Sequence, residues 1–387
     1  MRTLSFLADH LIVLSFAIIA CEGNIPAETP SVEVTLTASD TGGLVVSEPA
    51  GISCGTSCSA AFPVGTPVHL SVIPPQGMEI ASWQGACQGA ATTCLFTVTE
   101  ATAVAITYRK IIPTRTLLVT KSGTGTGLVT SDSAGLSCGS SCSLHLLEGS
   151  QVLLQISADD ASTFTGWSGA CTGTALSCPV VLTDDIAVNA AFGKPQSCAQ
   201  VKDSHPQAVD GAFKLFVGGD AAKPWDAFCQ LTAPTATYLP LVNTTTGNFS
   251  QYTAGGGRPG NTVRTTFQRL RINPETLRVN VADLTFALSA GLISNPDGSK
   301  ITRLNYGEAH DCLATNSSAG VGNVDLGGTP FAVAPNSFVT SGYLASGSAS
   351  YSADARSVNL RGGGFCGGTT VRSGASTPFN LQLLYQP

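Results

Sequence analysis

Apolar and polar residues alternate over most of the chain, in short runs separated by turn residues. Residues 68–72 (VHLSV) and 152–156 (VLLQI) are two such runs. Successive side chains of a strand point to opposite faces, so a period of two predicts a strand with one buried face. Stretches such as TGG, PPQG, GTGTG and DSAG end the runs and predict turns. We therefore expect a mainly β protein.

The pattern contains an internal repeat. A shift of 84 residues superimposes residues 44–108 on 128–192 without a gap and carries Trp83 onto Trp167. One module used twice explains such a match, and we expect it at residues 32–110 and 115–193, with about five or six strands in each copy. The shift also aligns four cysteines of the first copy with four of the second, namely Cys54, Cys58, Cys87 and Cys94 with Cys138, Cys142, Cys171 and Cys178.

The repeat stops near residue 196, and residues 197–387 are expected to form a separate, larger β-rich domain. It opens with a short amphipathic segment, 198–204, and strands at 213–217 and 225–231. Residues 265–287 predict a hairpin turning at Asn273-Pro274, because their apolar residues, from Leu270 to Val281, share one face. The other face carries three cations, Arg269, Arg271 and Arg278.

The N-terminus predicts export. One early cation, Arg2, precedes an apolar stretch, Leu11 to Ala20, that is too short to span a bilayer. The residues Ile18-Ile19-Ala20-Cys21 resemble the lipobox of bacterial lipoproteins, which implies that residues 1–20 are removed and that Cys21 carries a lipid anchor. Residues 21–31 then form a tether, and the protein is held at the outer membrane or cell surface. A plain signal peptide is the alternative.

Twelve cysteines remain besides Cys21, an even number in an oxidising compartment, which favours disulfides. Four thiolates per repeat would also suffice for zinc, but the zinc-ribbon spacing of two intervening residues is absent. Redox chemistry would need C-x-x-C at a helix start. Within each repeat we favour local pairs, Cys54 with Cys58 and Cys87 with Cys94, although crossed pairs remain open. Trp83 and Trp167 either pack against the second pair or stack on sugars at the surface.

Two family resemblances follow from these residues. The segments GLVTSDSAGLSCGSSC, GWSGAC and SWQGAC resemble bacterial surface repeats related to the divergent internalin B-type repeat, in which the modules are non-catalytic spacers or ligand-presenting arrays. The segments FCQL, GNFSQYT, TTFQRLRINPETLRVNVADLTFA, YGEAHDC, GNVDLGGTPFAV and GGGFCG resemble the GON domain, known from secreted zinc metalloproteases and from bacterial extracellular proteins. The second resemblance spans residues 198–387 and implies that Cys198 pairs with Cys229 and Cys312 with Cys366.

Catalytic motifs are missing from the sequence. The five histidines form no H-E-x-x-H, the spacing that binds zinc beside a Glu base. Glu308, His310 and Asp311 form the only His/carboxylate cluster, which we expect in a surface loop. No cofactor and no enzymatic activity are therefore expected.

The charge of the chain limits the classes of partner that we expect it to bind. The formal net charge is -6, which argues against nucleic acid. Of the 19 basic residues, 13 lie in residues 197–387, so the Arg face of the hairpin is a candidate site for sulfated or carboxylated polysaccharide. The partner expected for the whole protein is an extracellular glycan or a matrix protein. An ordinary polar outer face is the simpler interpretation. The sequence thus indicates a lipid-anchored binding or adhesion protein on a two-repeat stalk, or, alternatively, an accessory module of extracellular zinc metalloproteases. Its oligomeric state is open.

Overall fold

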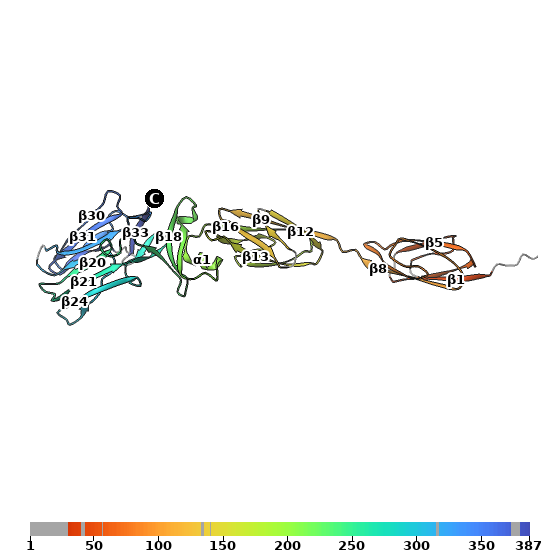
Figure 1. Ribbon diagram of the computed structural model, residues 1–387, viewed down its shortest axis with the longest axis horizontal. Helices are drawn as coiled ribbons and strands as arrows, with labels where there is room; N and C mark the ends of the chain where they lie inside the picture. The colour runs from red at the N-terminus through yellow and green to blue at the C-terminus, as the bar shows by residue number, and fades with distance from the viewer. Residues whose placement is uncertain are drawn as a thin grey trace, which may run out of the picture. The chain divides into compact units, whose positions relative to one another are not determined.

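The computed structural model describes residues 30–39, 43–55, 57–132, 135–139, 141–314, 317–372 and 380–387 (Figure 1). The chain divides into two compact units, one ending at Ile112 and one running from Pro113 to Pro387. Strands predominate among the described residues, so the mainly β prediction is confirmed. Cys21 lies outside these residues.

The first repeat module consists of two four-stranded sheets, ordered β4-β1-β8-β6 and β3-β2-β5-β7. Neighbouring strands are antiparallel except β1 and β8, which are parallel. Buried alternate residues of the two sheets, such as Val34 in β1 and Leu70 in β5, form its core. The strands are β1 (Ser31–Ala38), β2 (Leu44–Glu48), β3 (Ser53–Cys54), β4 (Ser57–Pro63), β5 (Pro67–Ile73), β6 (Met78–Gly85), β7 (Thr93–Thr97) and β8 (Thr102–Lys110).

The second module has the same topology, with sheets ordered β12-β9-β16-β14 and β11-β10-β13-β15. Its strands are β9 (Thr114–Gly123), β10 (Gly127–Ser131), β11 (Ser137–Cys138), β12 (Ser141–Leu147), β13 (Gln151–Ala158), β14 (Thr163–Gly169), β15 (Ser177–Val181) and β16 (Ile186–Gly193). The expectation of five or six strands per copy was too low. The two ends of each C-x3-C segment belong to strands, namely the short β3 and β11 and the start of β4 and β12.

Both disulfides of each module join its two sheets. Cys54 of β3 is bonded to Cys58 of β4, and Cys87, just after β6, is bonded to Cys94 of β7. The second module pairs Cys138 with Cys142 and Cys171 with Cys178. Because the two bridged strands belong to different sheets, each bond fastens one sheet of a small core to the other.

The two tryptophans are buried, at 3 % exposure for Trp83 and 6 % for Trp167, so the sugar-stacking alternative is wrong. Trp83 Nε1 donates to the Ala91 carbonyl oxygen at 2.7 Å, and Trp167 Nε1 donates to that of Ala175 at 2.8 Å. Each indole therefore holds the loop that the second disulfide closes.

The C-terminal domain packs a seven-stranded sheet against a ten-stranded one. The first has the order β17-β18-β19-β22-β23-β33-β28. Its strands are β17 (Gly211–Phe216), β18 (Pro224–Gln230), β19 (Ala236–Pro240), β22 (Arg269–Asn273), β23 (Arg278–Asn280), β28 (Phe331–Val333) and β33 (Asn380–Tyr385). One core cluster takes Trp225 and Leu381 from this sheet and Val324 and Val358 from the other. The fold is thus a two-layered sandwich.

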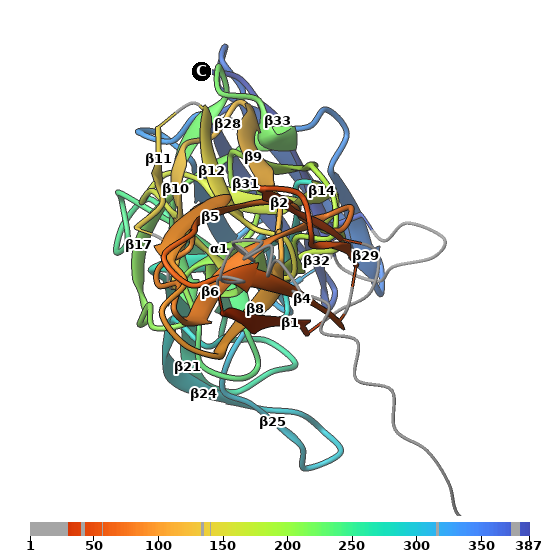
Figure 2. The same cartoon turned by 90° about the vertical axis from the view of Figure 1, so that its right-hand side faces the viewer.

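The ten-stranded sheet runs β25-β24-β21-β20-β26-β32-β29, with β27, β31 and β30 joined through β20. Its strands are β20 (Phe249–Thr253), β21 (Gly260–Phe267), β24 (Ala287–Ser294), β25 (Lys300–Ile301), β26 (Ala309–Asp311), β27 (Gly320–Asp325), β29 (Phe338–Gly342), β30 (Ala345–Tyr351), β31 (Ser357–Gly364) and β32 (Gly367–Val371). The β21, β24 and β25 strands lie side by side at one edge (Figure 2). Gly362 lets β31 approach β26, because a Cβ there would collide with the Ala309 carbonyl oxygen.

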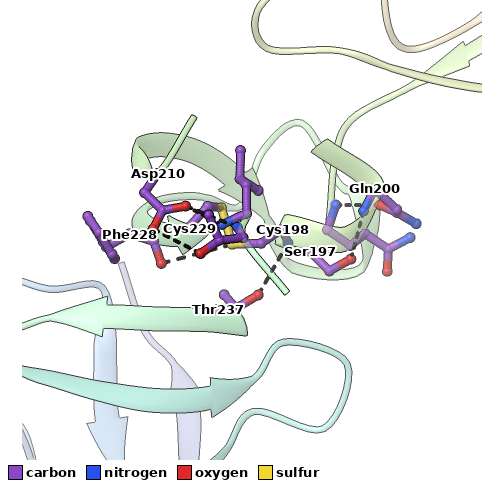
Figure 3. Close-up of a disulfide and its surroundings, with 10 residues drawn as sticks. Ser197, Cys198, Gln200, Asp210, Phe228, Cys229 and Thr237 are labelled. Atoms are coloured by element: carbon purple, nitrogen blue, oxygen red, sulfur yellow. Dashed lines mark hydrogen bonds between the residues drawn. A yellow bond between two sulfur atoms is a disulfide. The ribbon is translucent and has the colours of Figure 1, made fainter. Parts of the chain in front are cut away.

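The helix α1 (Cys198–Ser204) connects this domain to the second repeat. Ser197 caps it by accepting a hydrogen bond from Gln200 N at 3.3 Å. Figure 3 shows Cys198 bonded to Cys229 of β18 beside Thr237, whose Oγ1 accepts from Cys198 N. At the other end of the helix, buried Ser204 accepts a hydrogen bond from Phe164 N of the second repeat at 3.0 Å. The helix therefore ties two domains together within the second unit.

Candidate functional site

The predicted hairpin forms two central strands of the seven-stranded sheet. Leu270 and Ile272 of β22 and Val279 of β23 are buried, at 2 %, 3 % and 0 % exposure. The register places Ile272 opposite Val279 and Asn273 opposite Arg278. Since side chains alternate along a strand, the three arginines and Asn273 lie on the outward face.

A cavity of about 940 Å³ opens on this outward face. Arg271 and Arg278 line it, together with the helix cap Ser197 and the residues Ala199, Thr235, Ala236, Thr237, Ile272, Asn273, Pro274, Glu275, Thr276, Asn280 and Gln382. We call this the arginine groove. Two of the three predicted arginines meet here, with amide and hydroxyl side chains around them.

Arg269 lies on the same outward face of the sheet as Arg271, but its guanidinium group packs on aromatic rings. Its guanidinium carbon lies 3.6 Å from the centre of the Phe228 ring and 4.5 Å from that of Phe286. Those two rings and Tyr238 pack edge to face, and Arg269 covers them through cation–π contact. It does not line the arginine groove.

The guanidinium groups of both groove arginines are held by hydrogen bonds to neighbouring side chains. Arg271 Nη1 donates to Oδ2 of Asp283 at 3.3 Å, and the Asp283 side chain is only 9 % exposed. Arg278 Nε donates to Oε1 of Gln382 at 3.0 Å. Gln382 is fixed in turn, because its Nε2 donates to the carbonyl oxygens of Thr276 and Leu383 at 2.9 Å. Because these hydrogen bonds already restrict the rotamers of both arginines, a ligand that binds them removes less side-chain entropy.

Sequence reasoning missed Gln382 and Asp283. Gln382 enters the site from β33, about a hundred residues further along the chain, where it pairs with Arg278 across the sheet. Nothing local in the terminal LQLLY segment signals this pairing. Asn273 and Asn280 carry a weak local signal, because asparagine commonly starts turns.

The Glu308, His310 and Asp311 cluster is not in a surface loop, and that expectation was wrong. His310 and Asp311 belong to β26, which lies between β20 and β32 inside the ten-stranded sheet. Side-chain exposure is 13 % for Glu308 and 18 % for His310, and the two side chains approach to 3.8 Å. Asp311 is fully buried and accepts from Ser317 Oγ and Ala319 N, both at 2.7 Å. The cluster contributes to the core rather than to a surface.

Burial dominates the acid–base behaviour of this cluster. Loss of solvent lowers the pKa of His310 to about 4 and raises the pKa of Glu308. The His310 ring stacks on Tyr252 with ring centres 5.4 Å apart. Within the described residues, no group of three or more His, Cys, Asp or Glu side chains has the arrangement of a metal site. The same residues contain no helix that is long and apolar enough to cross a membrane.

Comparison with known families assigns the three domains. Residues 32–112 and 117–196 each match the family model of the divergent InlB B-repeat domain, and residues 257–381 match that of the GON domain. The GON match covers less than the expected 198–387, since residues 382–387 and residues 198–256 lie outside it. Residues 198–256 nevertheless supply β17, β18 and β19 of the seven-stranded sheet. Both are non-catalytic domain types.

Comparisons with curated proteins and with solved structures add no argument about the fold or the function. No curated protein matches the chain. One solved structure, that of the major pilin protein (T-13) from Streptococcus pyogenes serotype GAS131465, is 10 % identical, with a TM-score of 0.14, and the match covers 42 % of this chain and 95 % of that chain. A TM-score of that size does not indicate a shared fold.

Proposed function

From a chain that contains two divergent InlB B-repeat domains and a GON domain, we propose a surface-displayed, non-catalytic binding protein. The two repeats serve as a stalk, and the C-terminal domain binds an anionic extracellular ligand in the arginine groove. A lipid on Cys21 anchors the stalk to the membrane. Adhesion through the bound ligand is the biological role in this proposal.

The observation that carries the proposal is the arginine groove itself. Arg271 and Arg278 line a single cavity of about 940 Å³, near the upper end of the range of about 300 to 1,000 Å³ typical of ligand sites. Guanidinium groups pair with carboxylates and sulfates through two parallel hydrogen bonds. The positive charge also lies in the one part of the chain with a basic excess, 13 basic against 11 acidic residues in 197–387.

The direct test is retention of the purified full chain on immobilised anionic polysaccharides, heparin and polygalacturonate. The double variant Arg271→Ala/Arg278→Ala should elute at lower salt on the column that retains the wild type. Lys300→Ala/Arg303→Ala removes the same two positive charges from exposed positions outside the groove and serves as the matched control. Equal elution of the double variant and the wild type would refute the groove as the binding site.

A further inference from the structure

Resting on the proposed function, we infer that the ligand of the arginine groove is a saccharide chain with isolated carboxylates, such as a polyuronate, rather than a densely sulfated or phosphorylated polymer. Three features support this inference: the charge of the groove, the hydrogen-bonding groups that line it and the pairing of its strands.

The net charge of the groove is small. Its lining contains two arginines and one acid, Glu275. Arg271 is already paired with Asp283, whose side chain is 9 % exposed and does not line the groove. A polymer that carries several sulfates per disaccharide would therefore meet almost as many negative groups as positive ones. A ligand with one carboxylate per sugar matches the charge better.

The lining of the groove presents oriented donors. Asn273 Oδ1 accepts from Glu275 N at 2.9 Å and from Thr276 N at 3.1 Å, and Asn280 Oδ1 accepts from Ala282 N at 3.2 Å. Both amide oxygens are thus committed to turns, and both Nδ2 groups donate to no described residue. The groove therefore offers amide donors beside the guanidinium groups, which suits the hydroxyl, ring and carboxylate oxygens of an acidic sugar.

These groups form an ordered array rather than a random patch. Asn273, Arg278 and Gln382 lie opposite one another on β22, β23 and β33, so an amide, a guanidinium and a second amide follow each other across three strands. Adjacent strands are about 4.8 Å apart, and the row therefore spans about 10 Å. That length accommodates consecutive sugars of a chain rather than one small anion.

An acidic peptide fits the site less well. Peptides commonly bind sheets by adding a strand at an edge, where backbone groups are unpaired. The strands β22, β23 and β33 are internal, because the order β19-β22-β23-β33-β28 gives each of them two neighbours. A ligand on this face contacts side chains rather than unpaired strand-edge groups, and most of the residues that line the groove are polar or charged.

The test compares four ligands by titration calorimetry with the purified full chain: a galacturonate hexamer, its methyl ester, a heparin-derived hexasaccharide and a glutamate hexamer. The galacturonate hexamer should bind most tightly, and its uncharged ester should bind at least about tenfold more weakly, as expected for lost hydrogen bonds to charged groups. Binding of heparin but not galacturonate would overturn the inference and leave the proposed function standing. Binding of the ester as tightly as the acid, or of the glutamate hexamer as tightly as galacturonate, would also overturn the inference. Binding of no anionic ligand would overturn both.

One variant removes the amide donor of Asn280 and places a negative charge there. Asn280→Asp keeps an Oδ1 that can accept from Ala282 N but replaces the Nδ2 donor by a carboxylate oxygen. It should weaken galacturonate binding by about tenfold or more, while Arg303→Ala leaves it unchanged. Full affinity in Asn280→Asp would contradict the inference. If that variant does not fold, the comparison of acid and ester on the wild type decides.

Discussion

Arg269 lies with its guanidinium carbon 3.6 Å from the centre of the Phe228 ring, and it belongs to the same strand and the same sheet face as Arg271. The sequence presents the two arginines as equivalent. The structure separates them, because Arg269 covers aromatic rings whereas Arg271 lines a cavity.

Arg269→Ala should therefore reduce stability and leave ligand binding intact. Loss of a partly buried cation–π contact costs about 1 kcal/mol, which corresponds to a fall in Tm of about 2 to 4 °C for a domain of this size. Scanning calorimetry measures the fall, and the polysaccharide column measures binding. Loss of retention without loss of stability would place Arg269 in the binding site instead.

The disulfides should differ in their contribution to stability. Replacing Cys198 and Cys229 by Ala removes a bridge with a sequence separation of 31 and should cost about 4 kcal/mol, whereas replacing Cys54 and Cys58, separated by 4, should cost about 2 kcal/mol. Hydrogen exchange in a urea series, resolved by domain, measures both effects. Equal costs would contradict the dependence on loop length.

His310 should make the C-terminal domain sensitive to acid. Its pKa is about 4 in the folded chain and about 6.5 when unfolded, so the unfolded state binds a proton first as the pH falls. The contribution of His310 to the free energy of unfolding should be complete above pH 6.5 and should decline by about 3 kcal/mol between pH 6.5 and 4. His310→Gln should remove most of this slope. An NMR titration midpoint of His310 near 6.5 would contradict the burial argument.

The anchor at Cys21 is testable separately. Cys21→Ser should move the protein from the membrane fraction to the soluble fraction and abolish incorporation of labelled fatty acid, because acyl chains supply the membrane affinity. Cys87→Ser removes a different cysteine and should leave the labelling unchanged. Labelling that survives Cys21→Ser would place the lipid elsewhere or exclude the lipoprotein interpretation.

Much of the fold was predictable because its signals are local. Alternation at residues 68–72 marks β5, and the shift of 84 residues identifies the repeat. The parts of the fold that were not predicted depend on pairing between strands that are far apart in the sequence. The YGEAHDC segment has the composition of a polar loop. Its residues 309–311 nevertheless form β26, and the neighbouring strands β20 and β32 bury His310. Gln382 likewise reaches Arg278 only because β33 pairs with β23.

Hydrogen exchange of the full chain with and without a galacturonate or heparin oligosaccharide tests the central claim most directly. Our account predicts that added ligand protects residues 269–282 and 380–385 and that this protection disappears in Arg271→Ala/Arg278→Ala. Protection centred on the repeats or on the ten-stranded sheet, with the arginine groove unchanged, would contradict it.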